Sequence, residues 1–408
     1  MTSPWPRDLV TPEARALRDD LAALPETADP AALSAIRSAH PQADPDLISA
    51  LATQVRLQRR ARDRLGPWAE HLVLDEEALQ QATRRDVARY RAAQLVSRLG
   101  REGPTVADLG CGLGLDARAL AEVGCRVLAV ERDPWRAEAA AVNLTSYGDR
   151  VRVLCDDVTA LDPAVLADCD AAYVDPARRA SGGPRRIDGG RARAVTSPEE
   201  WSPPWSWVTA LAERLPVVAK VAPGFDTRWA PPKADLEWID DGGDTVEVAV
   251  WLGAFGHGVR RATVLDGEHA ETLEAPRDRK GVEGAATSQA AALLIEPSPG
   301  VIRAGLVAEL AARLGAVSLE GTTWLTADAM PTTLLARAWT VVEEVAHHPR
   351  ELRAWLRGRG SVTWKTSDTS SSAAEWDRRV GHRPGTGPAV TIVITGQRRA
   401  FAVARRVG

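Results

Sequence analysis

Apolar and polar positions divide the chain into a helical start, a region of alternating strands and helices, and a mixed end. Apolar residues recur at i, i+3 and i+4 within 12–24 and 44–65, which predicts two amphipathic helices. Gly66 and Pro67 then interrupt the pattern. Asp75 is a suitable N-cap for one long helix expected over 76–99.

From residue 105 onward, short apolar runs alternate with helical stretches. This spacing predicts βαβ units and a parallel sheet. Strands are expected over 105–110, 126–133, 151–157, 170–177 and 216–224, and helices over 115–124, 135–148 and 207–215. Residues 235–253 are expected to form a hairpin that turns at 241–243. The fold class is therefore α/β, with a Rossmann-like sheet.

The pattern changes again near residue 266. Residues 266–288 are polar and rich in turn formers, and 289–408 mix helical stretches with short strands. We therefore predict an N-terminal helical region over 1–74 and an α/β domain over 75–265. A linker over 266–288 and an α+β domain over 289–408 would follow.

Composition narrows the functional classes. The net charge of −4 gives no global nucleic-acid signature, so any basic surface must be local. The chain has no apolar run long enough for a membrane span, and residues 1–20 lack the apolar core of a signal peptide. Its four cysteines show no metal-binding spacing. We expect a cytoplasmic protein without a metal.

Only four of its 51 basic residues are lysine, so clustered arginine is weak evidence of function.

The stretch 108–114 reads Asp-Leu-Gly-Cys-Gly-Leu-Gly, between an expected strand and an expected helix. Glycine permits a close turn whose backbone N–H groups approach a ligand. The dinucleotide pattern G-x-G-x-x-G fails here because Leu115 takes the sixth position. Instead the stretch resembles the D-x-G-x-G-x-G of class I S-adenosylmethionine methyltransferases, as do five parallel strands followed by an antiparallel pair. The resemblance implies cofactor contacts from Asp108, Gly110, Gly112 and Gly114.

Acids also end the next three expected strands, where open α/β sheets bind their ligands. Glu131 lies 17 residues after Gly114, at a position where a carboxylate can bind both ribose hydroxyls. Asp156 and Asp157 end the third strand, where the resemblance implies an acid facing the adenine amino group, and we favour Asp157. Asp175 ends the fourth strand.

Residues 175–178 read Asp-Pro-Ala-Arg and form the candidate reaction site. They resemble the D/N-P-P-Y motif of amino-methylating enzymes, but the aromatic residue that stacks a base is missing. Pro176 would fix the chain, and Asp175 would hold the nucleophile. Arg178 and Lys220 are candidate phosphate ligands, and Lys220 could instead position a substrate or simply lie at the surface end of its strand. Residues 178–193 contain six arginines, which would suit either RNA contact or a solvated loop.

The chain as a whole resembles bacterial class I methyltransferases that carry a C-terminal THUMP-like domain. The resemblance rests on 74–92, on Lys220-Val-Ala-Pro-Gly224, and on 294–307 and 321–328. THUMP domains present RNA, so the resemblance implies S-adenosylmethionine as cofactor, RNA as partner and an RNA-base nitrogen as target. One departure is at 364–368, where Lys365 remains but Ser367 and Asp368 replace an expected Arg and Gly.

Other interpretations of the sequence stay open. The chain could be a cofactor-binding interaction module without catalysis, or a methyltransferase for a small molecule or a protein. A dehydrogenase is disfavoured by the failed dinucleotide pattern. Oligomeric state has no signal in the sequence.

Overall fold

The computed structural model describes residues 4–25, 30–177, 197–278, 286–287, 289–367, 371–396 and 399–405. The chain forms two compact units. The first comprises Met1–Val221, Asp226–Ala234 and Ala249–His257, and the second comprises Ala222–Phe225, Asp235–Val248 and Gly258–Gly408. Among the described residues, no helix is long and apolar enough to cross a membrane.

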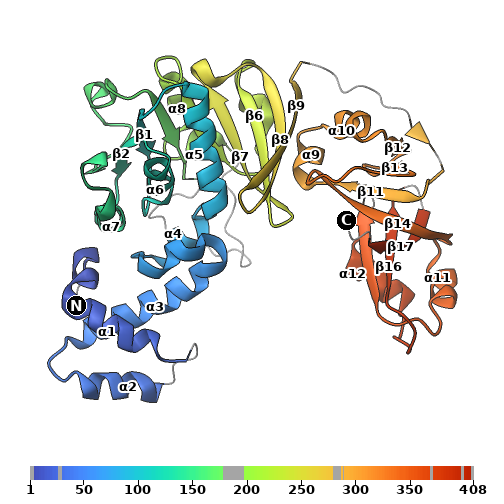
Figure 1. Ribbon diagram of the computed structural model, residues 1–408, viewed down its shortest axis with the longest axis horizontal. Coiled ribbons are helices and arrows are strands. Elements are labelled where there is room, and N and C mark those ends of the chain that lie inside the picture. Colours follow the sequence, from blue (N-terminus) through green and yellow to red (C-terminus); the bar gives the residue numbers. More distant parts are fainter. Residues whose placement is uncertain are drawn as a thin grey trace. The chain divides into compact units, whose positions relative to one another are not determined.

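Helices form the start of the first unit, as the periodicity predicts; they are drawn in blue in Figure 1. They are η1 (Pro6–Val10), α1 (Pro12–Ala22), α2 (Pro30–Ala39), α3 (Pro45–Leu65) and η2 (Gly66–His71). The Asp44 carboxylate caps α3 by accepting the Asp46 N–H at 2.8 Å. Gly66 ends α3 with a φ of 52°, which glycine adopts without strain.

The single helix expected over 76–99 is wrong, because two helices occupy this range. They are α4 (Glu76–Gln81) and α5 (Arg85–Leu99), and Asp75 caps α4 as predicted by accepting two backbone N–H groups. The Arg64 guanidinium donates to the carbonyls of Leu79 and Gln80 at 2.9 and 3.0 Å. Because α3 satisfies these C-terminal carbonyls from outside, α4 can end early without orphaned acceptors.

Five parallel strands form the sheet core of the first unit, and all five are confirmed. They are β1 (Thr105–Leu109), β2 (Arg126–Glu131), β3 (Val151–Cys155), β4 (Ala171–Val174) and β5 (Val217–Val221), connected in part by α6 (Leu115–Glu122), α7 (Pro134–Asn143) and α8 (Trp205–Leu211). The order is β3-β2-β1-β4-β5-β7, so the strand order reverses between β1 and β4. A crevice at that point is the usual ligand site of such sheets.

Strand β7 (Asp244–Leu252) belongs to both units, and in the second it continues the order β7-β6-β8-β9. The predicted hairpin is present. β6 (Asp235–Asp241) turns into β7 through Gly242 and Gly243, whose φ angles of 62° and 92° suit a type I′ turn. β8 (Val259–Asp266) runs parallel to β6, and β9 (His269–Pro276) runs antiparallel to β8. Part of the expected linker over 266–288 is therefore a strand, because its first turn formers close a hairpin.

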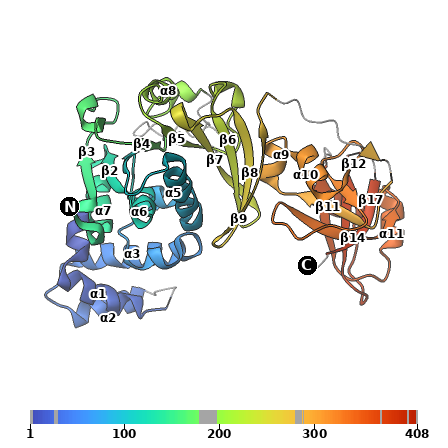
Figure 2. The ribbon, with the colours of Figure 1, turned by 45° about the horizontal axis from the view of Figure 1, so that its top comes forward.

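A second sheet dominates the end of the chain, as the predicted α+β character requires (Figure 2). Its order is β10-β12-β13-β11-β14-β17-β16-β15. The strands are β10 (Ala286–Thr287), β11 (Leu293–Pro297), β12 (Val317–Leu319), β13 (Leu325–Ala327), β14 (Ala336–Val345), β15 (Val362–Ser367), β16 (Val390–Thr395) and β17 (Arg399–Arg405). The helices are α9 (Pro299–Arg303), α10 (Val307–Leu314), α11 (Pro349–Trp355) and α12 (Ala373–Val380).

This second sheet curls strongly. The ammonium of Lys365 in β15 contacts both carboxylate oxygens of Glu296 in β11 at 2.8 Å, although three strands separate them in the sheet order. The same ammonium lies 4.8 Å from the centre of the Trp339 ring. Lys365 therefore closes the curl through an internal ion pair.

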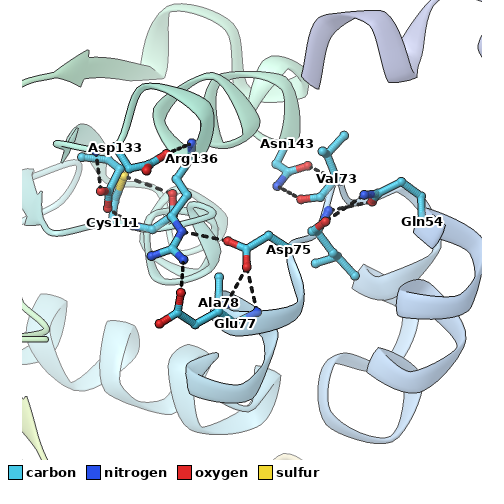
Figure 3. A network of polar contacts seen from close by, with 12 residues as sticks. Gln54, Val73, Asp75, Glu77, Ala78, Cys111, Asp133, Arg136 and Asn143 are labelled. Carbon is cyan, nitrogen blue, oxygen red and sulfur yellow. Dashed lines mark hydrogen bonds and ion pairs between the residues drawn. The ribbon is translucent and has the colours of Figure 1, made fainter. Parts of the chain in front are cut away.

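Residues 73–75 are clamped between the helical start and the sheet core (Figure 3). The Val73 N–H donates to Asn143 Oδ1 at 2.7 Å, and Asn143 Nδ2 donates to the carbonyls of Val73 and Leu113. From the other side, the Gln54 amide exchanges two hydrogen bonds of 2.8 Å with the Leu74 backbone. This clamp fixes the start of α4 against α7.

We expect Asn143→Ala to lower the free energy of unfolding by about 1–3 kcal/mol, because it leaves half-buried backbone groups without partners. Urea denaturation followed by circular dichroism measures this change. Thr145→Ala is the control: its hydroxyl donates to the Ala141 carbonyl on an exposed surface, and we expect a change within about 0.5 kcal/mol. Equal stability of the two variants would contradict a clamping role for Asn143.

Candidate active site

A cleft opens at the carboxyl ends of β1 to β4 in the first unit, at the predicted edge of the sheet. It encloses about 990 Å³ of space, open solvent at its mouth included. Its walls come from the end of α4 and the residues after it, the glycine-rich turn, the ends of β2, β3 and β4, and residues 202–203. Of the residues predicted from the sequence, Gly110, Gly112, Glu131, Asp156, Asp157 and Asp175 line it.

The glycine-rich turn presents bare backbone to this cleft. The N–H groups of Gly110 and Cys111 both donate to the Val130 carbonyl, which holds the turn against the end of β2. A Cβ atom on Gly112 would meet no heavy atom within 4 Å, so its backbone borders open space. Gly114 is required for another reason. A Cβ there would lie 2.7 Å from Leu144, so this glycine allows α6 and α7 to pack closely.

Glu131 reaches the cleft from the end of β2. One carboxylate oxygen accepts the Gly112 N–H and the other accepts the Asp133 N–H, each at 2.9 Å. The residue is 9% exposed, so its orientation is fixed by these two bonds. Each oxygen keeps a further lone pair, and the carboxylate can therefore accept bonds from two adjacent hydroxyl groups of a ligand.

Asp156 and Asp157 both line the cleft at the end of β3, so the structure does not separate them by position. Asp156 Oδ1 accepts the Asp157 N–H at 2.8 Å. Asp157 Oδ1 accepts both the N–H and the hydroxyl of Thr159, and these two hydrogen bonds lower the pKa of Asp157. The Asp157 carboxylate is thus held ionised and in place, and Oδ2 is its oxygen available to a donor.

Asp108 differs from the other predicted acids because it lies beneath the turn and is fully buried. It is not among the described residues that line the cleft, so direct cofactor contact finds no support. Neither carboxylate oxygen makes a hydrogen bond of good geometry to the described residues, although the backbone N–H of Ala117 is close enough to lower the pKa of Asp108. Burial raises the pKa of Asp108 well above its ordinary value, the carboxylates of Asp116 and Asp175 raise it further, and Arg91 acts in the opposite direction. Burial in this position therefore favours the neutral form of Asp108 more than it would be favoured in a solvent-exposed aspartate.

Lys220 lies against Asp175. Its ammonium lies 2.6 Å from Asp175 Oδ2, 3.0 Å from Thr83 Oγ1 and 3.3 Å from the Gln81 carbonyl. An ammonium has three hydrogens, and three acceptors surround this one. Lys220 is 12% exposed in its side chain and does not belong to the described cleft lining, so a phosphate-binding role finds no support.

Sequence reasoning missed the wall of the cleft that α4 and the break after it provide. Ala78, Gln81, Ala82 and Thr83 line the cleft there, where we expected a continuous helix. The stretch has no motif, and its role depends on long-range contacts that the local pattern does not encode. Of these residues and their contacts, only Lys220 could have been noticed from composition, because lysine is rare in this chain.

Residues 175–177 are tied to a second chain segment. Ala177 and Ser202 exchange backbone hydrogen bonds of 2.8 and 3.0 Å, and Arg132 donates to the Ser202 hydroxyl at 3.0 Å. These bonds fix the chain just after Pro176 and close one side of the cleft. Arg178, together with the arginine-rich stretch to residue 193, lies outside the described residues.

Comparison with known proteins decides the family. The chain is 31% identical over 312 residues to an uncharacterized S-adenosylmethionine-dependent methyltransferase of Mycobacterium tuberculosis, which covers 74% of this chain and 79% of that protein. The chain belongs to the S-adenosylmethionine-dependent methyltransferases. A candidate methyltransferase from Porphyromonas gingivalis W83 shares the fold with a TM-score of 0.77 at 20% identity, covering 96% of this chain and 97% of that one.

A partial relative of this methyltransferase is named ribosomal RNA small subunit methyltransferase J, from Actinobacillus pleuropneumoniae. It is 34% identical over 146 residues, which cover 32% of this chain and 56% of that protein. A scan against protein-family models finds no match. The likeness to THUMP-like domains stays a prediction.

The cleft fits S-adenosylmethionine, the cofactor of this family. The cofactor supplies a methyl group that its positively charged sulfur has already activated. Open space beside Gly112 leaves room for a ligand against the backbone, and Glu131 has the two acceptors that a ribose requires. Asp156 or Asp157 would face the adenine amino group. Within the described part of the chain, no group of three or more potential ligands is placed to hold a metal.

We expect Glu131→Ala to weaken S-adenosylmethionine binding by roughly 10²-fold or more. Two charge-assisted hydrogen bonds of about 1.5–3 kcal/mol each would be lost. Isothermal titration calorimetry measures the dissociation constant, with the exposed Asp149→Ala as the matched control. An affinity equal to that of the wild type would remove the ribose assignment.

Asp108→Asn should make stability less dependent on pH. Because its pKa is raised by folding, Asp108 stabilises the protein fully below the pH at which it ionises in the unfolded chain. That stabilisation is lost as the pH rises towards the raised pKa, by up to about 1.4 kcal/mol per pH unit. Urea unfolding between pH 5 and 8 should show the wild type losing stability relative to the variant. If the free energies of unfolding of the wild type and the variant change with pH in parallel, Asp108 is ionised in the folded protein over this range.

Proposed function

We propose that this methyltransferase transfers the methyl group to a nitrogen of an RNA base. The observation that carries the chemistry is the position of Asp175, which lines the same cleft as the glycine-rich turn and Glu131. A hydrogen-bond acceptor therefore stands beside the cofactor site. An acceptor suits a nucleophile that carries N–H. The partial relative named for ribosomal RNA supports RNA as the substrate class.

The residues of the chain supply alignment and a proton acceptor. Asp175 Oδ2 is engaged by Lys220, which leaves Oδ1 to accept the N–H of an incoming base. Holding the nucleophile in line with the methyl group removes most of the entropic barrier to reaction. Once the new N–C bond forms, the nitrogen must lose a proton, and the Asp175 carboxylate is the nearby base. Pro176 and the Ala177–Ser202 bridge keep this acceptor in place.

Contacts to the RNA backbone belong to other parts of the chain. Arg178 and the other arginines up to residue 193 follow Asp175 directly and would neutralise phosphates. Within the C-terminal α+β region, Lys365 is paired with Glu296, so it adds no support for RNA binding there. The proposal that residues 289–408 present RNA to the active site rests on the resemblance to THUMP domains alone.

We expect Asp175→Ala to abolish methyl transfer while the dissociation constant for S-adenosylmethionine changes by less than about tenfold, or ~1.4 kcal/mol. The assay follows labelled methyl groups into total cellular RNA. Asp168→Ala, an exposed acid near β4, is the control and should retain activity.

Digesting the RNA with ribonuclease before the reaction should remove the labelled product. Label that persists in protein or in small molecules after digestion would overturn the RNA proposal. Full activity in Asp175→Ala would show instead that the reacting centre lies elsewhere in the cleft.

A further inference from the structure

The break between α4 and α5 holds the two acceptors that fix Lys220. In a continuous helix, the Gln81 carbonyl would accept the Arg85 N–H. The backbone of Ala82 is instead non-helical, with ψ of 134°, and the Gln81 carbonyl accepts from Lys220. The break thus releases a backbone acceptor and places the Thr83 hydroxyl beside it.

Thr83 links two charged pairs. Its Oγ1 lies 3.0 Å from Asp116 Oδ2 and 3.0 Å from Lys220 Nζ. An ionised carboxylate only accepts and an ammonium only donates. The single hydroxyl proton of Thr83 must therefore point at Asp116, and an oxygen lone pair must face Lys220. The charges of Asp116 and Lys220 therefore determine the orientation of the Thr83 hydroxyl.

Asp116 is itself held firmly. It forms an ion pair with Arg91, and its side chain and that of Arg91 are 14% and 3% exposed. Tyr173 also donates its hydroxyl to Asp116 at 3.3 Å, while the Arg91 guanidinium lies 4.4 Å from the centre of the Tyr173 ring. The result is one continuous series of contacts from α5 to the end of β4: Arg91, Asp116, Thr83, Lys220 and Asp175.

We propose that Thr83 is a positioning residue for methyl transfer, and that its hydroxyl orients the Lys220 ammonium and through it the Asp175 carboxylate. This inference rests on the proposed role of Asp175. Thr83 does not touch the reacting atoms; it removes the freedom of Lys220 to rotate away from Asp175 Oδ2. The acceptor at Asp175 Oδ1 is then held in one orientation towards the cleft.

Thr83→Val tests the proposal because it keeps the shape of the side chain and removes the hydroxyl. We expect kcat with total RNA to fall by roughly 10–10²-fold, since a small misplacement of an aligning group is costly. KM and the dissociation constant for S-adenosylmethionine should change less than about threefold, which marks a loss specific to the transition state. Thr83→Ser should restore kcat, and the exposed Thr145→Val is the matched control.

A spectroscopic readout makes the test independent of the substrate. The chain has four lysines, so labelling lysine with ¹⁵N at Nζ gives few ammonium resonances. The resonance of Lys220, assigned by its loss in Lys220→Met, should be visible because three acceptors slow its exchange. In Thr83→Val, and in Thr83→Ala as a second variant, it should shift or broaden. Thr83→Ser should keep it, and Lys233 and Lys365 serve as internal references.

The outcomes separate the two proposals. An unchanged Lys220 resonance in both hydroxyl-free variants would overturn the positioning role. Wild-type kcat in Thr83→Val would also overturn it, provided that Asp175→Ala is inactive. A fully active Asp175→Ala would refute the proposed role of Asp175 instead, while the resonance still shows whether Thr83 holds Lys220.

Discussion

Charge compensation at the carboxyl ends of β1 and β4 governs how this active site is built. Asp108, Asp116 and Asp175 are close enough for the other two carboxylates to raise the pKa of Asp108. Three negative charges in a largely buried space would repel one another strongly. The fold reduces this repulsion by two means: burial favours the neutral form of Asp108, and Asp116 and Asp175 each form an ion pair, with Arg91 and Lys220 respectively.

The compensating groups show how α4 and α5, which precede the sheet, contribute to the cleft. Arg91 comes from α5, and Thr83 from the break that precedes it. That break is placed by α4, whose first turn is held by Arg136 of α7 through Asp75 at 2.8 Å and Glu77 at 3.1 Å (Figure 3). The segment before the sheet therefore provides one wall of the cleft and the far end of the charge network.

The features that could be predicted from the sequence are those set by residues close together along the chain. The glycine-rich turn, the five parallel strands and the acids that end them follow from apolar runs and from residues needing positive φ. Thr83 and Arg91 were missed because their roles depend on contacts between distant segments. Arg91 is also one of many arginines, so its burial could not be distinguished by composition. Lys220 was noticed for its rarity, but only the structure shows its ammonium turned to Asp175 and Thr83.

This arrangement also separates the negative charge of the cleft into two regions. The pairs Arg91–Asp116 and Lys220–Asp175 each carry no net charge, and burial favours the neutral form of Asp108. The other carboxylates that line the cleft are Glu131, Asp156 and Asp157, on the side where β2 and β3 end. Arg132 and Arg136 also line that side, and Arg136 is paired with Asp75 and Glu77. The role proposed for Asp175 therefore depends on Lys220. The ion pair reduces the attraction of this carboxylate for the positively charged sulfur and leaves Oδ1 to accept a hydrogen bond from the nucleophile.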